Sequence, residues 1–288
     1  MLTLIIIFSL MPLSVLYVLA DYLIYPLVRH VVRYRLKVVQ KNIRLSFPEK
    51  SLQEQNELVN AFYHHFADIL VEIIYGFRIS DQEMLERVVF DNVDMLEELA
   101  HKKHGVMVYL GHICNWEWLA DLNKRFQDKS IIEYNVYRKQ KNSVIDKIML
   151  KLRGKRGGEC VEKNGLLRKL VKLRQADYPF VVGLIADQKP TPRNAHVWTT
   201  FLNQETAFLD GGEVLVRKLD FGAAYANIIS PKRGYYHIHF EVITEEPTAM
   251  KENEITLTYA RLIEDNIRQQ PQRWLWTHNR WKYQRPQE

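Results

Sequence analysis

The chain has 288 residues, of which 47% are hydrophobic and 26% charged, so it can bury a core and global disorder is excluded. Its net charge of +6 favours acidic partners such as phosphate groups, anionic lipid or an acidic protein. The two cysteines, Cys114 and Cys160, exclude a disulfide framework and lack the Cys/His spacing of a metal site, which favours a reducing compartment.

The N-terminal stretch is apolar. Residues 1–20 carry no charged side chain, and the run 22–28 is apolar again after Asp21. Since about 20 apolar residues span a bilayer, we predict a transmembrane or interfacial anchor over 1–28 and a single α/β domain with a helical N-terminal region over 29–288. A cleaved signal peptide is the alternative, but the stretch has neither a basic start nor a small-x-small cleavage site. By the positive-inside rule, the cations between Arg29 and Arg44 predict that the chain after the anchor lies on the cytoplasmic side of a membrane.

Strands and helices alternate through most of the remaining sequence. Ser51 and Glu54 have the spacing of a capping box at the start of a long helix. Hydrophobic periodicity predicts helices over 51–76, 80–87, 92–103, 116–126, 142–152, 164–175, 211–219 and 255–270, and strands over 106–110, 130–137, 180–186, 221–230 and 235–243. We predict an apolar loop over 198–208, as a lid or membrane-facing lip, and a membrane-interface belt over 274–281. The fold class is α/β, with a mostly parallel central sheet flanked by helices.

The sharpest chemical feature is a histidine directly after a buried strand. His112 follows the apolar run 106–110, and Glu117 lies in the first turn of a helix begun by Asn115. This arrangement predicts a general base, His112, with Glu117 as its orienting partner. No Gly-x-Ser-x-Gly nucleophile elbow is present, and Cys114 is a disfavoured nucleophile. Without an enzyme nucleophile, the pair would activate a substrate hydroxyl directly. Because no Walker loop or Gly-x-Gly-x-x-Gly occurs, no cofactor and no metal are expected.

Two other predicted strands end in polar residues. Tyr137 and Arg138 follow one strand, and Asp187 and Gln188 follow another. In a parallel sheet these ends would share an edge with His112, which makes all four substrate-binding candidates; Asp187 is alternatively a helix cap or a turn residue. Residues 138–156 contain eight Lys or Arg and one acid, so this run is either a solvated face or an anion-binding surface.

These motifs together resemble the lipid A secondary (lauroyl/myristoyl-type) acyltransferase family of the lysophospholipid acyltransferase superfamily. The resemblance covers the whole chain, and the matching features occur in order: the apolar N-terminus with its basic follow-on; Asn42–Pro48; His112 with Glu117; Val136–Arg138; Arg153; Ala186–Gln188; and Trp274–Lys282. It implies a glycerolipid-acyltransferase-like fold, a catalytic His/acid pair, and a need for the residues at Arg153 and Asp187. The stretches 113–116, 189–194 and 198–202 depart from the family pattern.

The resemblance implies transfer of an acyl chain from acyl carrier protein, or acyl-CoA, to a hydroxyl of a lipid A precursor. The acceptor is alternatively a lysophospholipid or an amino-acid-linked lipid. Arg153 and Arg138, or backbone N–H groups after Asn115, would hold the oxyanion or a phosphate, and the run 138–156 would dock the carrier protein. Rival hypotheses are a thioesterase that uses the same pair on water, and a non-catalytic lipid-binding protein. A nucleic-acid role is not expected, since no reader fold is recognisable.

Overall fold

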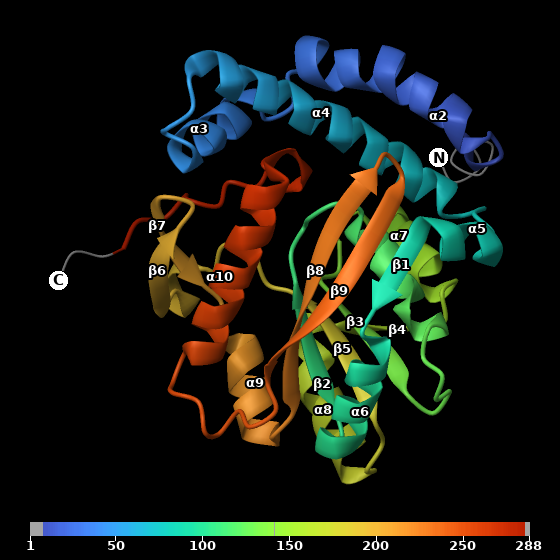
Figure 1. Cartoon of the computed structure of the whole chain (residues 1–288), viewed down its shortest axis with the longest axis vertical. Coiled ribbons are helices and arrows are strands. Elements are labelled where there is room, and N and C mark those ends of the chain that lie inside the picture. The colour runs from blue at the N-terminus through green and yellow to red at the C-terminus, as the bar shows by residue number, and fades with distance from the viewer. Residues whose placement is uncertain (1–7, 141, 286–288) are drawn as a thin grey trace.

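The computed structural model describes residues 8–140 and 142–285, and within them a seven-stranded sheet is accompanied by a two-stranded hairpin (Figure 1). The order of strands across the sheet is β1-β9-β8-β2-β5-β3-β4. The strands of the sheet are β1 (Val88–Asp91), β2 (Val106–Leu110), β3 (Ile132–Tyr137), β4 (Glu159–Glu162), β5 (Phe180–Ile185), β8 (Gly222–Lys232) and β9 (Tyr235–Thr244), and the separate hairpin consists of β6 (Val197–Phe201) and β7 (Gln204–Phe208).

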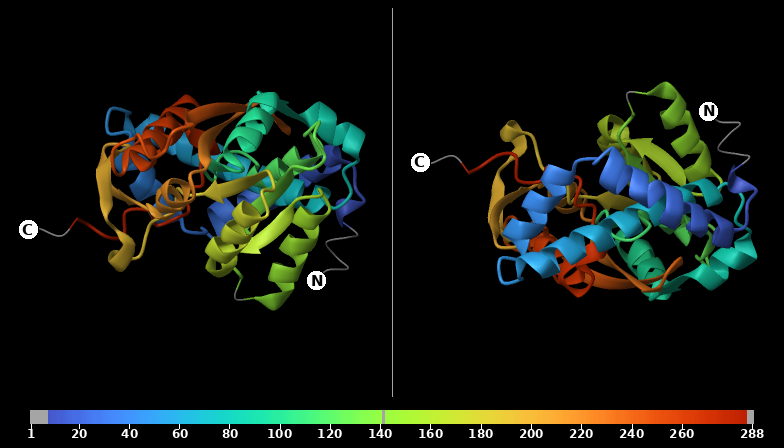
Figure 2. Two further views of the ribbon diagram at one scale, coloured as in Figure 1. Left: turned by 90° about the horizontal axis from the view of Figure 1, so that it is seen from below. Right: turned by 90° about the horizontal axis from the view of Figure 1, so that it is seen from above.

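The central part of the sheet is parallel, which confirms the predicted α/β class. Strands β8, β2, β5, β3 and β4 run in one direction, whereas β9 is antiparallel to β8 and β1 runs with β9. All five residues of β2 are buried, as expected for a parallel strand covered on both faces. Helices cover both faces of the sheet (Figure 2).

The helices agree with the sequence pattern in most places. They are α2 (Leu13–Leu19), η1 (Ala20–Ile24), η2 (Leu27–Val31), α3 (Leu36–Ser46), α4 (Leu52–Tyr75), α5 (Asp81–Arg87), α6 (Val93–Lys103), η3 (Trp116–Lys124), α7 (Ser143–Gly154), η4 (Lys163–Gly165), α8 (Leu166–Gln175), η5 (Pro192–Asn194), α9 (Gly211–Leu219), α10 (Glu254–Gln269) and η6 (Pro271–Arg273). The capping box of α4 is present, with Ser51 and Glu54 bonded in both directions. The helix after His112 is a 3₁₀ helix, η3.

The N-terminal helices lie across the end of the sheet where the parallel strands finish (Figure 1). In the described residues no one helix combines the length and apolarity needed to cross a bilayer; only the bent pair Leu13–Val31 and Leu36–Ser46, at 86° to each other, meets that test jointly. Residues 1–7 of the predicted anchor lie outside the described residues. The predicted boundary between residues 28 and 29 falls inside η2. The anchor over 1–28 and the separate domain over 29–288 stay predictions.

Two polar clusters join these N-terminal helices to the rest of the molecule. Arg233, in the turn between β8 and β9, binds both Asp21 and Asp68 through its guanidinium group. Buried Glu72 of α4 accepts hydrogen bonds from two tyrosines and, at 2.8 Å, from the side chain of Asn115. Asn115 is three residues from His112, so α4 contacts the turn that carries the candidate base.

The prediction of a membrane-interface belt over 274–281 is wrong for its first two tryptophans. Trp274 and Trp276 are 2% and 0% exposed and belong to the hydrophobic core. Their indole N–H groups are satisfied inside the protein, by Asp187 and by the carbonyl of Pro271, which allows both rings to be buried. The predicted apolar loop over 198–208 is instead the β6–β7 hairpin, and its Phe201 packs against Trp274.

Candidate active site

Adjacent strands β2 and β5 bring His112 and Asp187 together. Leu110 and Ile185 are partners in the parallel register, so each polar residue follows its strand at the same edge. Nδ1 of His112 lies 2.6 Å from Oδ1 of Asp187, and the backbone N–H of His112 donates to Oδ2 at 2.8 Å. Two contacts therefore fix both the position and the ring orientation of the histidine.

Gly111 makes this turn possible. A Cβ atom at this position would lie 2.3 Å from Cδ1 of Ile263 in α10 and 3.4 Å from Oδ2 of Asp187. A side chain at this position would therefore have to displace the end of the Ile263 side chain, and the glycine permits the close approach.

The segment after α10 holds the pair from the other side. Trp274 donates its indole N–H to Oδ2 of Asp187 at 2.8 Å. Ile113 and Trp274 form an antiparallel bridge, and the backbone N–H of Leu275 donates to the carbonyl of His112 at 3.0 Å. The turn that carries His112 is thus paired with a segment far away in the sequence.

The electrostatics assign the acid–base roles within the pair. Burial alone would raise the pKa of Asp187, but the charge of His112, its two hydrogen bonds and the Trp274 N–H together lower it to about 2. The carboxylate is therefore ionised at neutral pH and accepts a hydrogen from Nδ1, which leaves Nε2 of His112 as the basic atom. The exposed side chain of Gln188 lies beside it, with 3.3 Å between the amide nitrogen and Nε2.

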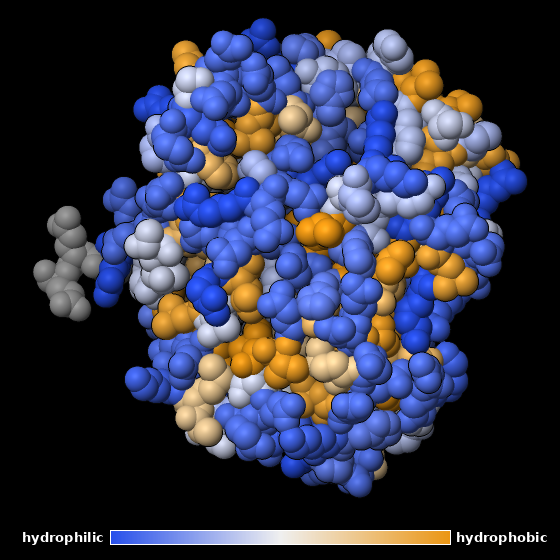
Figure 3. Space-filling view, viewed as in Figure 1, coloured by the Kyte–Doolittle hydropathy of each residue, from blue (hydrophilic) through white to orange (hydrophobic). Residues whose placement is uncertain are grey.

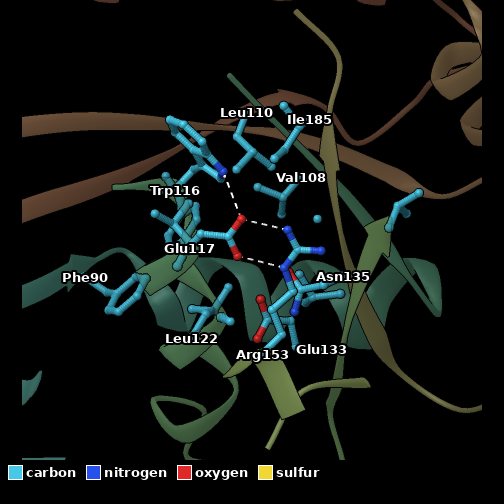
Figure 4. A pocket seen from close by; sticks show the side chains of 16 residues that line it. Phe90, Val108, Leu110, Trp116, Glu117, Leu122, Glu133, Asn135, Arg153 and Ile185 are labelled. Carbon is cyan, nitrogen blue, oxygen red and sulfur yellow. Dashed lines mark hydrogen bonds and ion pairs between the residues drawn. The ribbon is translucent and has the colours of Figure 1, made fainter. Parts of the chain in front are cut away.

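Glu117 has a different partner from the one expected. Arg153 of α7 binds it at two points, Nε to Oε2 and Nη2 to Oε1, each at 2.7 Å, and the indole of Trp116 donates to Oε1 at 3.1 Å (Figure 4). Asp187 occupies the place beside Nδ1 of His112 that the sequence suggested for Glu117. The reason is the fold: the next strand in the sheet presents its carboxylate at the same edge, whereas η3 directs Glu117 toward α7.

Trp116 connects the two pairs. Its ring packs edge-on against the imidazole of His112, with 4.9 Å between ring centroids, and its N–H binds Glu117. Arg153 is mostly buried, and although burial lowers the pKa of its guanidinium, the bonds to Glu117 raise it above the ordinary value. This second pair is therefore a buried, fully charged unit one aromatic ring away from His112.

A mostly apolar pocket opens beside these groups (Figure 4). It is lined by Phe90, Val108, Leu110, Trp116, Glu117, Leu119, Ala120, Leu122, Glu133, Asn135, Val136, Arg153, Val181, Gly183, Ile185 and Phe240. The carboxyl group of Glu133 is fully buried, and burial raises its pKa to about 8. Glu133 is thus mainly protonated at pH 7 and adds no charge to the pocket.

The predicted substrate residues at the end of β3 lie apart from the histidine. Arg138 is exposed and Tyr137 half-buried; among the described residues, neither contacts His112 or Asp187 through a hydrogen bond. In the basic run, Arg138, Lys139, Lys147, Lys151 and Lys155 are exposed, and Lys141 lies outside the described residues. Arg156 is buried against Asp121 and Asp81, so it has a structural role.

Cys114 is unsuited to act as a nucleophile. It is fully buried, and burial raises the pKa of its thiol to about 12, so the thiolate is disfavoured at neutral pH.

Sequence reasoning did not identify Trp274, His278 and Arg280 as candidate site residues. His278 accepts the backbone N–H of Lys189, and burial lowers its pKa to about 4, so it is neutral. The only sequence signal was the mixture of aromatic and basic residues over 274–281, which also suits a membrane surface.

Comparison with known proteins agrees with this architecture. The family model for bacterial lipid A biosynthesis acyltransferases matches residues 1–283. The chain is 23% identical, over 258 residues, to the lipid A biosynthesis palmitoleoyltransferase of Escherichia coli (strain K12) and to the lipid A biosynthesis acyltransferase of Shigella flexneri; each match covers 88% of this chain and 81% of the relative. Identity is also 23%, over 252 residues, to the lipid A biosynthesis lauroyltransferase of Escherichia coli (strain K12), covering 86% and 79%. With the whole sheet, the histidine turn and the Trp274 segment inside the matched region, the chain belongs to the bacterial lipid A biosynthesis acyltransferase family and is an acyltransferase.

Proposed function

We propose that the protein transfers a fatty acyl group from a thioester of acyl carrier protein to a hydroxyl of a lipid A precursor at the cytoplasmic surface of the inner membrane. The observation that carries the proposal is the histidine itself. Nε2 of His112 is the nitrogen without a hydrogen, Asp187 holds the opposite nitrogen at 2.6 Å, and an apolar pocket begins at the neighbouring Trp116.

The proposed chemistry needs no covalent enzyme intermediate. Nε2 of His112 removes the proton from the acceptor hydroxyl, and the oxygen attacks the thioester carbonyl. The tetrahedral intermediate then breaks its C–S bond, and the leaving thiolate takes the proton back from the imidazolium. Asp187 stabilises that imidazolium, because it stays ionised throughout. General-base assistance of this kind typically supplies a factor of about 10²–10⁴.

The developing oxyanion needs a donor, and two are available. Arg153 uses Nε and Nη2 on Glu117, so its guanidinium is held rigidly beside the apolar pocket. The backbone N–H groups at the start of η3 are the second source. A rigid, partly buried donor stabilises developing charge without reorganising during the reaction.

The acyl chain is assigned to the apolar pocket. Its walls come from the middle of the sheet and from η3. Among the described lining residues, only Glu117 and Arg153 bring charge, because Glu133 is mainly protonated. A pocket with an apolar body and one charged end suits a fatty acyl thioester, whose polar carbonyl must remain near His112.

Association with a membrane is supported by the N-terminal helices. They carry exposed apolar side chains, and Figure 3 shows apolar surface above α2 at the upper right of that view. The exposed residues in this part of the chain are Phe8, Leu10, Val15, Val18, Tyr22, Leu23, Leu27, Val31, Val32 and Tyr34. The exposed cations Arg33, Arg35 and Lys37 follow directly, so the same end offers an apolar face and a basic one, as an interfacial anchor does.

Docking of acyl carrier protein is assigned to the exposed cations of α7 and its flanks. Arg138, Lys139, Lys147, Lys151 and Lys155 form this basic set, and α7 also supplies Arg153 to the candidate site. An acidic carrier would be attracted to this surface and would deliver its thioester close to the apolar pocket.

The test is an acyl-transfer assay with purified wild-type protein and His112→Ala. Acyl carrier protein thioester and a lipid A precursor are supplied, and both the acylated lipid and free fatty acid are measured by mass spectrometry. We expect transfer by the wild type and none above background by the variant, with an unchanged circular dichroism spectrum. Near-normal transfer by His112→Ala would overturn the assignment. Fatty acid released at the transfer rate in the absence of acceptor would instead indicate a thioesterase.

A further inference from the structure

Arg280 is a buried cation without a matching anion. Its side chain is 3% exposed, and burial lowers the pKa of its guanidinium to about 10 despite the opposing influence of Asp187. Within residues 8–140 and 142–285, no carboxylate lies within ion-pair distance of it. The one hydrogen bond of its side chain within the described residues is from Nη2 to the carbonyl of Ala207, at 2.5 Å, and its Nε has no partner there.

Such an arrangement is unfavourable unless something compensates the charge. A buried charge is normally paired, because removing it from water costs several kcal/mol. Asp187 does not fill this need, since its oxygens are occupied by His112 and Trp274. The stacking of Arg280 on Phe208, at 4.7 Å from the ring centre, supports the cation only weakly. An anionic ligand would complete the site.

The surroundings show where such a ligand would enter. Arg280 lines a small second pocket between the β6–β7 hairpin and the C-terminal segment, which lie side by side in Figure 1. The same pocket is lined by Lys189 and by the rings of Trp198, Trp281 and Tyr283. Its one carboxylate, on Glu205, is exposed and is paired with Arg285.

This second pocket is close to the candidate base. Lys189 directly follows Gln188, whose amide contacts Nε2 of His112 at 3.3 Å, and the backbone N–H of Lys189 binds His278. The apolar pocket adjoins His112 through Trp116 instead. His112 therefore contacts the apolar pocket through Trp116, and it contacts Gln188, which precedes the Lys189 of the cationic, aromatic pocket.

We propose that Arg280 and Lys189 bind a phosphate group of the acceptor lipid, and that the aromatic rings contact the sugar that carries it. The inference builds on the proposed function, because lipid A is by definition a phosphorylated glucosamine disaccharide. Arginine and lysine are the usual protein ligands of phosphate, and flat aromatic faces suit the apolar sides of a pyranose ring. The second pocket would then orient the acceptor hydroxyl toward Nε2 of His112.

The test compares phosphorylated and phosphatase-treated lipid A precursor as acceptors for the full-length protein. Lys189→Gln and Arg280→Gln remove one charge each, and Lys163→Gln is the matched control, since Lys163 is exposed and lies in η4. We expect the two pocket variants to raise the KM for the phosphorylated acceptor roughly 10- to 100-fold, as expected for loss of a charge-assisted hydrogen bond. The preference of the wild type for the phosphorylated over the dephosphorylated acceptor should be lost in both pocket variants and kept in the control.

Inorganic phosphate separates the possible sources of the anion. Inhibition that competes with the acceptor, and that weakens in Lys189→Gln, supports the proposal. Inhibition that competes with the acyl donor, or a rise in the KM for the acyl donor, assigns the pocket to a phosphate group of the donor and overturns the proposal. An equal rise in KM for the phosphorylated and the dephosphorylated acceptor also overturns the proposal. If Arg280→Gln does not fold, Lys189→Gln decides. A wild type that acylates neither acceptor contradicts the proposed function itself.

Discussion

Nδ1 of His112 lies 2.6 Å from Oδ1 of Asp187, a residue 75 positions later in the chain. The contact sets the tautomer, because an ionised carboxylate accepts the hydrogen of Nδ1 and leaves Nε2 free. The proposed base is thus positioned by the pairing of two neighbouring strands, β2 and β5.

Replacing Asp187 with Asn tests this relationship. An amide offers its NH₂ group to Nδ1, which moves the imidazole hydrogen to Nε2 and removes the base. We expect kcat to fall by about 10²–10⁴-fold, while circular dichroism stays unchanged. In the wild type, protonation of Asp187 should not limit kcat/KM at any pH well above 2, since the pKa of Asp187 is about 2. An Asp187→Asn enzyme with more than a tenth of normal kcat would contradict the role.

Trp274→Phe removes one donor from Asp187 and keeps an aromatic ring in place. The loss of this hydrogen bond raises the pKa of Asp187 and loosens its contact with His112. We therefore expect kcat to fall roughly 3- to 30-fold, the effect of about one hydrogen bond to a charged group. The KM values for the acyl donor and for the acyl acceptor should stay unchanged. Trp276→Phe is the matched control, because its N–H binds only the carbonyl of Pro271. A purely structural role for Trp274 would give both variants the same change in melting temperature and no separate change in kcat.

The Glu117–Arg153 pair should behave as a buried unit. Arg153→Met leaves the carboxylate of Glu117 without its partner, and we expect a loss of about 3–5 kcal/mol in unfolding free energy. The double variant Glu117→Gln/Arg153→Met should recover most of that loss in urea denaturation. Glu117→Gln alone should lower activity without displacing the acid limb of the pH–rate profile, because His112 is oriented by Asp187. A shift of the acid limb of the pH–rate profile in Glu117→Gln would indicate instead that Glu117 orients His112.

The exposed apolar face of the N-terminal helices should control membrane binding. Val18, Leu23 and Val31 are 54%, 59% and 72% exposed. Changing all three to Ser should weaken binding to anionic vesicles at least about tenfold, because each side chain would otherwise bury apolar area in the lipid. The control changes three comparably exposed side chains elsewhere, Leu85, Leu167 and Val214, to Ser. Flotation assays that show equal losses for both triple variants would refute a specific face.

Sequence reasoning identified the strand ends but not every partner. The apolar runs that became β2 and β5 placed His112 and Asp187 at strand ends, and parallel strands put such ends on one edge. The order of strands cannot be inferred from spacing, and β5 lies between β2 and β3 although β3 comes first in the chain. Glu117 was favoured by nearness in sequence, yet the direction of its side chain depends on the packing of η3 against α7.

The missed elements share a physical cause. β1 and β4 each have four residues, too few to show a periodic pattern, and both lie at sheet edges where burial is incomplete. Trp274 gave no local sign of its role because an aromatic side chain beside cations suits either a membrane surface or a core. Its burial is decided by the hairpin β6–β7 and by Asp187, both distant in sequence.

The three residues of the candidate site come from widely separated parts of the chain: His112 and Asp187 are 75 positions apart, and Asp187 and Trp274 are 87 apart. Contacts that close such long loops form late, after local helices and hairpins are in place. We therefore expect the candidate site to be completed late in folding, so that a partly folded chain can hold most of its helices while lacking the His112–Asp187–Trp274 arrangement.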